Sequence, residues 1–213
     1  LLGRQRQFAI AGDELAAGVE HLVFSSVVNP DPSTRVPLFT SKGKVIEHIR
    51  AVGIPATILK PVWFMENFGT VFLPALQAGK LSLPLPNDYV LDMVSLDVIG
   101  AFGTAAFLRP SEFIGKTVEV ASDSLPLTEV VRQISGAFGK TIGYEELPAD
   151  QAEGALGPLF ARMFEWFREV KPKADFNEIR KWRIPLTKFK DHLATAAWVK
   201  GARSNSSELA AKA

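Results

Sequence analysis

The sequence has no cysteine, no long apolar run and almost no net charge. Without cysteine, disulfides and thiolate chemistry are excluded, and the chain suits a reducing compartment, so we expect a cytoplasmic protein. No apolar stretch approaches the ~20 residues of a membrane-spanning helix, and we expect no membrane partner. A net charge of +1 provides no basic excess, so we expect no direct nucleic-acid partner.

Two signatures of catalytic chemistry are missing as well. His21, His48 and His192 are too far apart to match the ligand spacing of a metal site, and we expect no metal. The sequence also lacks the G-x-S-x-G motif of a serine hydrolase. Metal-dependent and serine-hydrolase functions are therefore not expected.

The residues that are present indicate an α/β domain. Nearly half of them are apolar (47%), which is enough for a buried core. His21–Val28 and Pro55–Leu59 are apolar runs typical of strands buried on both faces. Between them, Thr40–Val52 has a helical apolar stripe, with Thr40 or Ser41 as its expected cap and Gly53 as its stop. This order predicts a βαβ unit with a parallel sheet.

Shorter elements follow the second strand. We predict helices at 64–78 (broken at Pro74), at 97–108, from Thr128 to Gly139, and over most of 149–199. Extended segments are predicted at 81–85, 89–94, 117–121 and 141–146. Residues 8–17 are also helix-like.

Lys42 is the most informative charged residue. It lies in the first turn of the predicted helix, on the stripe that includes Leu38, Val45 and Ile49. That helix begins near the carboxyl ends of the strands, the edge at which open α/β sheets bind ligands. A lysine facing this edge can donate hydrogen bonds to ribose hydroxyls or phosphate. The alternative is that its stem packs while its ammonium reaches water.

Ser25 and Ser26 end the first strand at the same predicted edge. Their hydroxyls could bind a substrate carbonyl or the cofactor, or they could simply be two small residues at a strand end. Position 61 is a proline, which lacks a backbone donor and directs the chain outward from the second strand.

The aromatic pair Trp63 and Phe64 follows that proline. These rings could form the wall of a pocket for a flat ring system, or they could belong to the core. Glu66 and Asn67 could supply polar contacts or cap the next helix. The stripe of Phe160, Met163, Phe164 and Phe167 is interpreted as core or as a lid.

The segments His21–Ser26, Phe39–Glu47, Gly53–Pro61 and Phe64–Phe68 resemble the NmrA-like family of atypical short-chain dehydrogenase/reductases. The resemblance extends over nearly the whole chain, through Asp97-Val98, Gly115-Lys116, Leu127-Thr128, Met163-Phe164 and Ile184-Pro185.

The resemblance implies a Rossmann-like fold that binds NADP, with NAD as the alternative. In this family Lys42 would face the nicotinamide ribose, and Ser25 or Ser26 would polarise the hydride acceptor. The nicotinamide site would be lined by Ser25, Ser26, Val27, Lys42, Pro61, Val62, Trp63, Phe64 and Asn67. Some members reduce quinones or ketones, and others bind the dinucleotide without turnover and regulate a partner protein.

The sequence departs from the family pattern twice. The G-x-x-G-x-x-G turn that holds the pyrophosphate is absent, so we expect the first strands of the sheet to precede Leu1. The proton-donating tyrosine four residues before the lysine is Leu38, which weakens a standard ketone reduction.

We therefore expect hydride transfer from NADPH to a small carbonyl or quinone, or alternatively a non-catalytic NADP(H) sensor that acts through a regulatory protein partner. A fragment with neither activity is the third alternative, and an oligomer is compatible with all three. Residues 1–80 would be the carboxyl-terminal part of a Rossmann domain. Residues 81–200 would form a smaller α+β lobe for substrate or lid, interleaved with the last Rossmann elements, and 201–213 a disordered tail.

Overall fold

The structure is a computed structural model that describes residues 18–31 and 34–202. These residues form two compact units, each assembled from three stretches of chain. Unit 1 holds the described residues of Leu1–Val62, with Asp97–Val120 and Ala174–Ile184. Unit 2 holds Trp63–Leu96, Ala121–Lys173 and the described residues of Pro185–Ala213.

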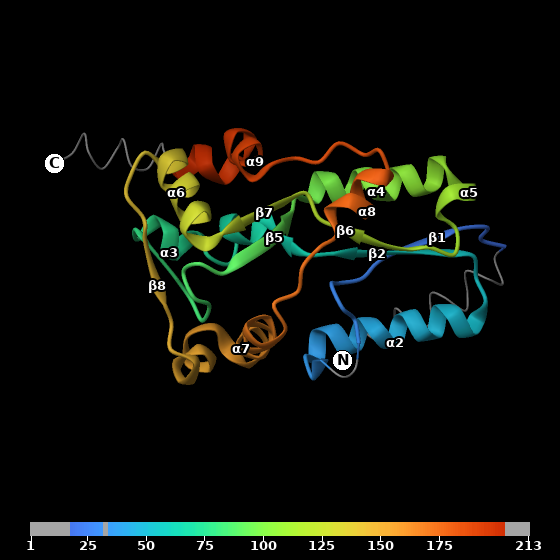
Figure 1. Cartoon of the computed structure of the whole chain (residues 1–213), viewed down its shortest axis with the longest axis horizontal. Helices are drawn as coiled ribbons and strands as arrows, with labels where there is room; N and C mark the ends of the chain where they lie inside the picture. Colours follow the sequence, from blue (N-terminus) through green and yellow to red (C-terminus); the bar gives the residue numbers. More distant parts are fainter. Residues whose placement is uncertain (1–17, 32–33, 203–213) are drawn as a thin grey trace. The chain divides into compact units, whose positions relative to one another are not determined.

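Unit 1 is built on a parallel sheet. Its strands are β1 (Leu22–Ser25), β2 (Ala56–Pro61) and β6 (Thr117–Val120), in the order β1-β2-β6. The helix α2 (Pro37–Val52) covers one face of this sheet. The other face carries α4 (Leu96–Leu108), α5 (Pro110–Phe113) and α8 (Phe176–Lys181), as Figure 1 shows. The predicted α/β fold with a Rossmann-like parallel sheet is therefore confirmed.

Local sequence explains where α2 begins and ends. It starts at Pro37, three residues before the predicted start, because proline needs no hydrogen-bond acceptor in the first turn. Its N-cap is Val36, without a side-chain hydrogen bond, so the predicted cap at Thr40 or Ser41 is wrong. The predicted stop is confirmed: Gly53 adopts φ 77°, and its N–H donates to the carbonyls of Arg50 and Ile49.

The core of unit 1 lies between α2 and the sheet. Val45, Ile46 and Ile49 of α2 pack with Ile54 and Ile58. The predicted stripe is wrong at its first position, since the side chain of Leu38 is 37% exposed. The buried face of the helix begins at the neighbouring residue Phe39, which is 2% exposed.

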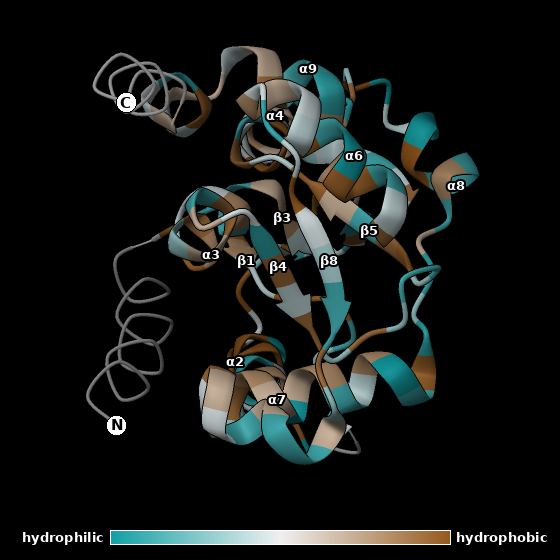
Figure 2. Ribbon diagram, turned by 90° about the vertical axis from the view of Figure 1, so that its left-hand side faces the viewer, coloured by the Kyte–Doolittle hydropathy of each residue, from teal (hydrophilic) through white to brown (hydrophobic). Residues whose placement is uncertain are grey.

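Unit 2 contains two small sheets. In the first, β3 (Trp63–Phe64), β5 (Val90–Val94) and β7 (Asp123–Pro126) follow the order β3-β5-β7, and β5 and β7 are antiparallel. In the second, β4 (Lys80–Leu83) runs parallel to β8 (Gly143–Glu146), a polar and largely exposed strand (Figure 2). The helices of this unit are η2 (Met65–Gly69), α3 (Leu73–Gln77), α6 (Leu127–Phe138), η3 (Ala149–Gln151), α7 (Ala152–Val170) and α9 (Phe189–Thr195).

Most predicted elements outside the first βαβ segment are confirmed, among them α4, β6, β8 and the helices after 149. The helical segment predicted at 64–78 is confirmed in part, because η2 and α3 occupy most of it. Its first residue, Phe64, is in β3 instead, and Pro74 lies in the first turn of α3 and not at a break. Thr128 does not cap α6, whose N-cap is Pro126.

Two further predictions fall partly or wholly outside the described residues. The helix predicted at 8–17 lies entirely outside them. Of the predicted tail, Gly201 and Ala202 are helical and Ala202 is 4% exposed, while 203–213 lie outside.

Candidate functional site

The ammonium of Lys42 lies at the carboxyl end of β1. Its Nζ donates a long hydrogen bond of 3.5 Å to the carbonyl of Ser25, the last residue of the strand. The same atom is 5.1 Å from the centre of the Phe24 ring, within the range of a cation–π contact. Desolvation of the partly buried amine lowers the pKa of Lys42 below its ordinary value. The side chain thus reaches the sheet edge from the second turn of α2, not from the first turn as predicted.

Phe24 was not among the predicted site residues, although strand alternation could have identified it. Successive side chains of a strand point to opposite faces, so Phe24 and Ser26 share one face. Since Lys42 lies over the Phe24 ring, its ammonium is on the face that carries the Ser26 side chain. Val27, between Ser26 and Val28, points to the opposite face and is half-buried.

The side-chain hydroxyl of Ser26 has no hydrogen-bond partner among the described residues, and its carbonyl lacks the partner that a regular ladder would provide. The residue is 3% exposed, and its hydroxyl oxygen is buried without a hydrogen-bond partner among the described residues. Its N–H donates to Leu59 O (2.8 Å), and in a regular parallel ladder its carbonyl would accept from residue 61. Residue 61 is a proline, which has no N–H to donate. A buried polar group without a partner is costly, so this position is one where a water or ligand is expected.

Pro61 and Val62 continue the sheet beside this position. The carbonyl of Pro61 accepts from Val28 N (2.9 Å), and Val62 N donates to Val120 O (3.2 Å). Strand β2 extends through Pro61, so its predicted end at Leu59 is wrong. Both Pro61 and Val62 are buried. The chain is held here between the extension of β1 and strand β6.

The remaining predicted residues belong to unit 2. Trp63 is 5% exposed and lies within an aromatic cluster. Its ring centre is 5.6–6.4 Å from those of Phe68, Phe72, Phe164 and Phe167. This placement favours the core interpretation over a ligand wall, and Met163, Phe164 and Phe167 are likewise buried.

Phe64 and Asn67 are half-buried. Phe64 pairs with Val94 in the β3–β5 ladder, and the backbone carbonyl of Asn67 accepts from Phe72 N at 3.1 Å. Glu66 does not cap the helical turn that contains it. Its Oε1 accepts from Leu96 N (2.9 Å), thirty residues later, a partner that local sequence could not reveal.

Within the described ranges, no helix is long and apolar enough to span a membrane. In the same part of the chain, no three His, Asp or Glu side chains converge in a way that could hold a metal ion. The site residues described above instead offer a cation, a hydroxyl and backbone carbonyls, which are groups that bind polar organic ligands.

Comparisons with known proteins identify similar chains. The sequence model of the NmrA-like family matches residues 4–190. Among curated proteins, an NAD(P)H azoreductase of Xenophilus azovorans is 24% identical over 152 residues, covering 71% of this chain and 53% of the azoreductase. The chain spans about half the length of these curated relatives.

Solved structures show the same fold. An NADPH-dependent quinone oxidoreductase of Escherichia coli, complexed with NADPH, superposes with a TM-score of 0.73 at 19% identity, covering 88% of this chain and 69% of that one. NmrA, a negative transcriptional regulator complexed with NADP, superposes with a TM-score of 0.69 at 17% identity, covering 93% and 72%. At these identities the likeness concerns the fold alone.

Proposed function

Because this chain belongs to the NmrA-like family, whose model matches residues 4–190, we propose that its unit 1 supplies the nicotinamide side of an NAD(P) site. The protein would transfer hydride from NADPH to a small carbonyl or a quinone. NADP is favoured over NAD because the similar quinone oxidoreductase and NmrA structures hold NADPH and NADP.

The position of the Lys42 ammonium is the observation that carries the proposal. It lies at the carboxyl end of a parallel strand, where α/β folds bind dinucleotides, and it donates to the backbone carbonyl of Ser25 at 3.5 Å. A hydrogen bond of that length is weak, so the ammonium retains donors for ribose hydroxyls. Lys42 would thus orient the nicotinamide ribose.

Ser26 would contact the reacting part of the ligand. Its buried hydroxyl can donate to the oxygen of a carbonyl or quinone, and this donor would stabilise the negative charge that develops as hydride arrives. Its carbonyl, left without a ladder partner by Pro61, can accept from the nicotinamide carboxamide. Ser25, which is exposed at the strand end, is the alternative hydroxyl donor.

A non-catalytic NADP(H) sensor acting through a protein partner is the second candidate, and Leu38 favours it. This residue lies four positions before Lys42 and carries no hydroxyl to protonate a reduced carbonyl. The similarity to NmrA, a negative transcriptional regulator, agrees with that alternative. Both candidates use the same Lys42 and Ser26 contacts.

The test is NADPH oxidation by the protein that contains this chain, measured with a panel of quinones and small carbonyls. Lys42→Ala should weaken NADPH binding at least about tenfold, because a hydrogen bond from a charged donor contributes about 1.5–3 kcal/mol. Ser26→Ala should lower kcat more than it raises KM for NADPH. The matched control is Lys44→Ala, an exposed lysine on the same helix, which should change neither constant.

The outcomes separate the two candidates. Turnover that falls in the Ser26 variant supports the reductase. Binding of NADPH without turnover of any acceptor supports the sensor. Full NADPH binding by the Lys42 variant would refute the proposed site in either case.

A further inference from the structure

The ammonium of Lys42 contacts the last two residues of β1. Its Nζ donates to the carbonyl of Ser25 at 3.5 Å and lies 5.1 Å from the centre of the Phe24 ring. A hydrogen bond of that length restrains its donor only weakly. The face of an aromatic ring carries partial negative charge and attracts an ammonium that lies within about 6 Å of its centre. The ring therefore restrains the position of this ammonium more strongly than the carbonyl does.

The Phe24 ring is itself fixed by the sheet and by the core of unit 1. The backbone of Phe24 pairs with that of Ile58 in the ladder between β1 and β2, and its side chain packs against the apolar cluster beneath α2. Lys42 lies three residues before Val45 and seven before Ile49, so it projects from the same face of α2 as these two core residues. The ring thus contacts both the core and the charged end of the lysine.

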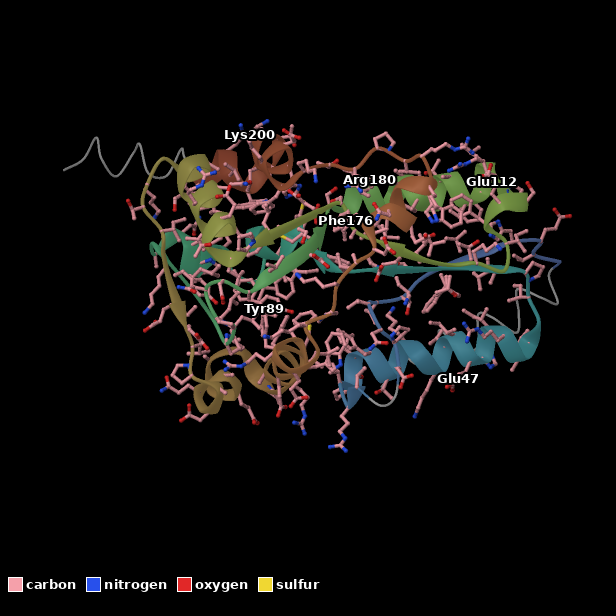
Figure 3. All side chains as sticks on the ribbon, in the orientation of Figure 1. Glu47, Tyr89, Glu112, Phe176, Arg180 and Lys200 are labelled. Carbon is pink, nitrogen blue, oxygen red and sulfur yellow. The ribbon has the colours of Figure 1, made fainter. Side chains whose placement is uncertain are left out.

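Polar side chains of α2 near Lys42 are directed elsewhere. The hydroxyl of Ser41 donates to the carbonyl of Leu38 at 2.7 Å, within the helix itself. Glu47, the one carboxylate of α2, is exposed and projects from the helix in Figure 3. Within the described residues, Lys42 forms no ion pair with this or any other carboxylate. Burial of the amine removes water and lowers the pKa of Lys42, and the ring face offsets part of this loss.

We propose that Phe24 is a positioning residue, whose ring holds the Lys42 ammonium at the carboxyl end of β1 before the ligand arrives. An ammonium has three N–H groups. With one donated to Ser25 and one directed at the ring, the third is left for a ribose hydroxyl. A lysine side chain has many rotamers, and ordering it in advance reduces the free energy lost on binding. This inference rests on the proposed role of Lys42 in binding the nicotinamide ribose.

The contact itself can be tested by NMR on the 213-residue chain without a cofactor. Protons above the face of an aromatic ring are shifted upfield, so the ε-methylene signal of Lys42 should lie upfield of those of the other lysines. Its assignment follows from its loss in Lys42→Arg. Phe24→Leu should move the signal to the ordinary lysine position, whereas Phe24→Tyr, which keeps a ring, should leave it upfield. An ordinary position in the parent chain would overturn the inference.

The role of the ring is tested by the dissociation constant of NADPH for the protein that contains this chain. Phe24→Leu should raise this constant about three- to tenfold, the range expected for one partly desolvated cation–π contact. Phe24→Tyr should stay within about twofold of the parent, because the ring face is retained. Phe24→Met, an unbranched apolar side chain without a ring, should repeat the effect of Phe24→Leu and serves in its place if that variant does not fold.

A double-mutant cycle separates positioning from a general loss of packing. In a Lys42→Ala background, Phe24→Leu should weaken NADPH binding no further, because the ring then has no ammonium to hold. An equal loss in both backgrounds would overturn the positioning role and assign the ring to the core alone. Phe107→Leu removes an exposed ring from α4 in the same unit and should change neither the Lys42 signal nor NADPH binding.

Failure of this inference can be distinguished from failure of the proposed function. Unchanged NADPH binding by Lys42→Ala would contradict the proposed site itself, whatever the effect of Phe24→Leu. Weak binding by Lys42→Ala together with full binding by Phe24→Leu would contradict the positioning role alone. Circular dichroism should show the same helix content in every variant that enters the comparison.

Discussion

At the scale of single residues, His21 connects three elements of unit 1 through one chain of hydrogen bonds. The Thr57 hydroxyl donates to the carbonyl of Phe113 (2.8 Å), so its oxygen must accept from Nε2–H of His21 (2.8 Å). The other ring nitrogen, Nδ1, is buried without a hydrogen-bond partner among the described residues. Protonation would therefore bury an N–H without an acceptor, and desolvation lowers the pKa of His21 below 6.5.

This tautomer predicts a loss of stability in acid. Below pH 6.5 the unfolded chain binds a proton at His21 that the folded chain takes up only at lower pH. The free energy of unfolding should therefore fall as the pH decreases below 6.5. Above pH 6.5, His21 is neutral in both states and should not make the free energy of unfolding depend on pH. His21→Gln keeps a donor for Thr57 but cannot titrate, so urea denaturation across this range should show a shallower dependence on pH. A slope in the His21 variant equal to that of the parent would contradict the assignment.

Asp123 holds the start of α9 in unit 2. It is 7% exposed, and its Oδ2 accepts from Phe189 N (2.9 Å) while Oδ1 accepts from Lys188 Nζ (3.0 Å). Asp123→Ala leaves a buried backbone N–H without an acceptor, and should lower the free energy of unfolding by about 2–4 kcal/mol. Asp123→Asn should lose less, because an amide oxygen can still accept from Phe189.

Thermal unfolding measures the effect, with Asp150→Ala as the exposed control, expected within about 0.5 kcal/mol of the parent. A neutral Asp123→Ala variant would mean that this carboxylate does not organise α9.

Sequence alone could place Lys42 at the sheet edge but could not decide the environment of Trp63. The position of Lys42 follows from a helical stripe and a strand end, both of which are local patterns. The burial of Trp63 depends on Phe164 and Phe167, about one hundred residues away, and nothing near residue 63 reveals them. Ser26 is an intermediate case, because its missing ladder partner follows from Pro61 once the strand register is known.

At the scale of elements, glycines at helix ends and in helix interiors should respond oppositely to alanine. Gly53 ends α2 at φ 77°, a left-handed conformation that costs a residue with Cβ about 1–2 kcal/mol. Gly100 lies inside α4, and a Cβ added there meets no atom within 4 Å. Gly53→Ala should therefore destabilise unit 1 by about 1 kcal/mol, and Gly100→Ala should stabilise it by about 0.5–1 kcal/mol.

The two glycine variants can be compared in one series of urea denaturation curves. Both variants add the same methyl group, but the free energy of unfolding should fall in Gly53→Ala and rise in Gly100→Ala. Each variant is therefore a control for the other. A stabilising Gly53→Ala change would show that α2 does not end in the left-handed turn.

The elements predicted well are those whose pattern is complete within one segment. The apolar runs of β1 and β2 and the stripes of α2 and α4 each identify an element without reference to distant residues. The 64–78 segment is helical at η2 and α3, but its first residue belongs to β3, which exists only through its pairing with β5, thirty residues later. The pairing of β4 with β8 spans about sixty residues, so their order in the sheet could not be read from either strand.

At the scale of the whole molecule, the edge of the unit 1 sheet at β1 governs what this chain can bind. Leu22 N and Ser26 N donate toward β2, so in the alternating ladder the backbone groups of Val23 and Ser25 face the other way. Within the described residues, no strand pairs with that side of β1. The 213 residues also contain no G-x-x-G-x-x-G turn to hold a pyrophosphate at a helix N-terminus.

These two features predict that the 213-residue chain by itself binds NADPH weakly, with a dissociation constant above about 100 µM. Lys42 and Ser26 can contact the nicotinamide side, but the phosphates, which carry most of the charge, would lack their backbone donors. Calorimetry should therefore detect no saturable heat at micromolar NADPH. Joining the chain to a glycine-rich βαβ segment that pairs with β1 should restore binding, and Lys42→Ala should abolish that gain. Tight stoichiometric binding by the chain alone would show that its own residues hold the pyrophosphate, and the open edge of β1 would then not limit cofactor binding.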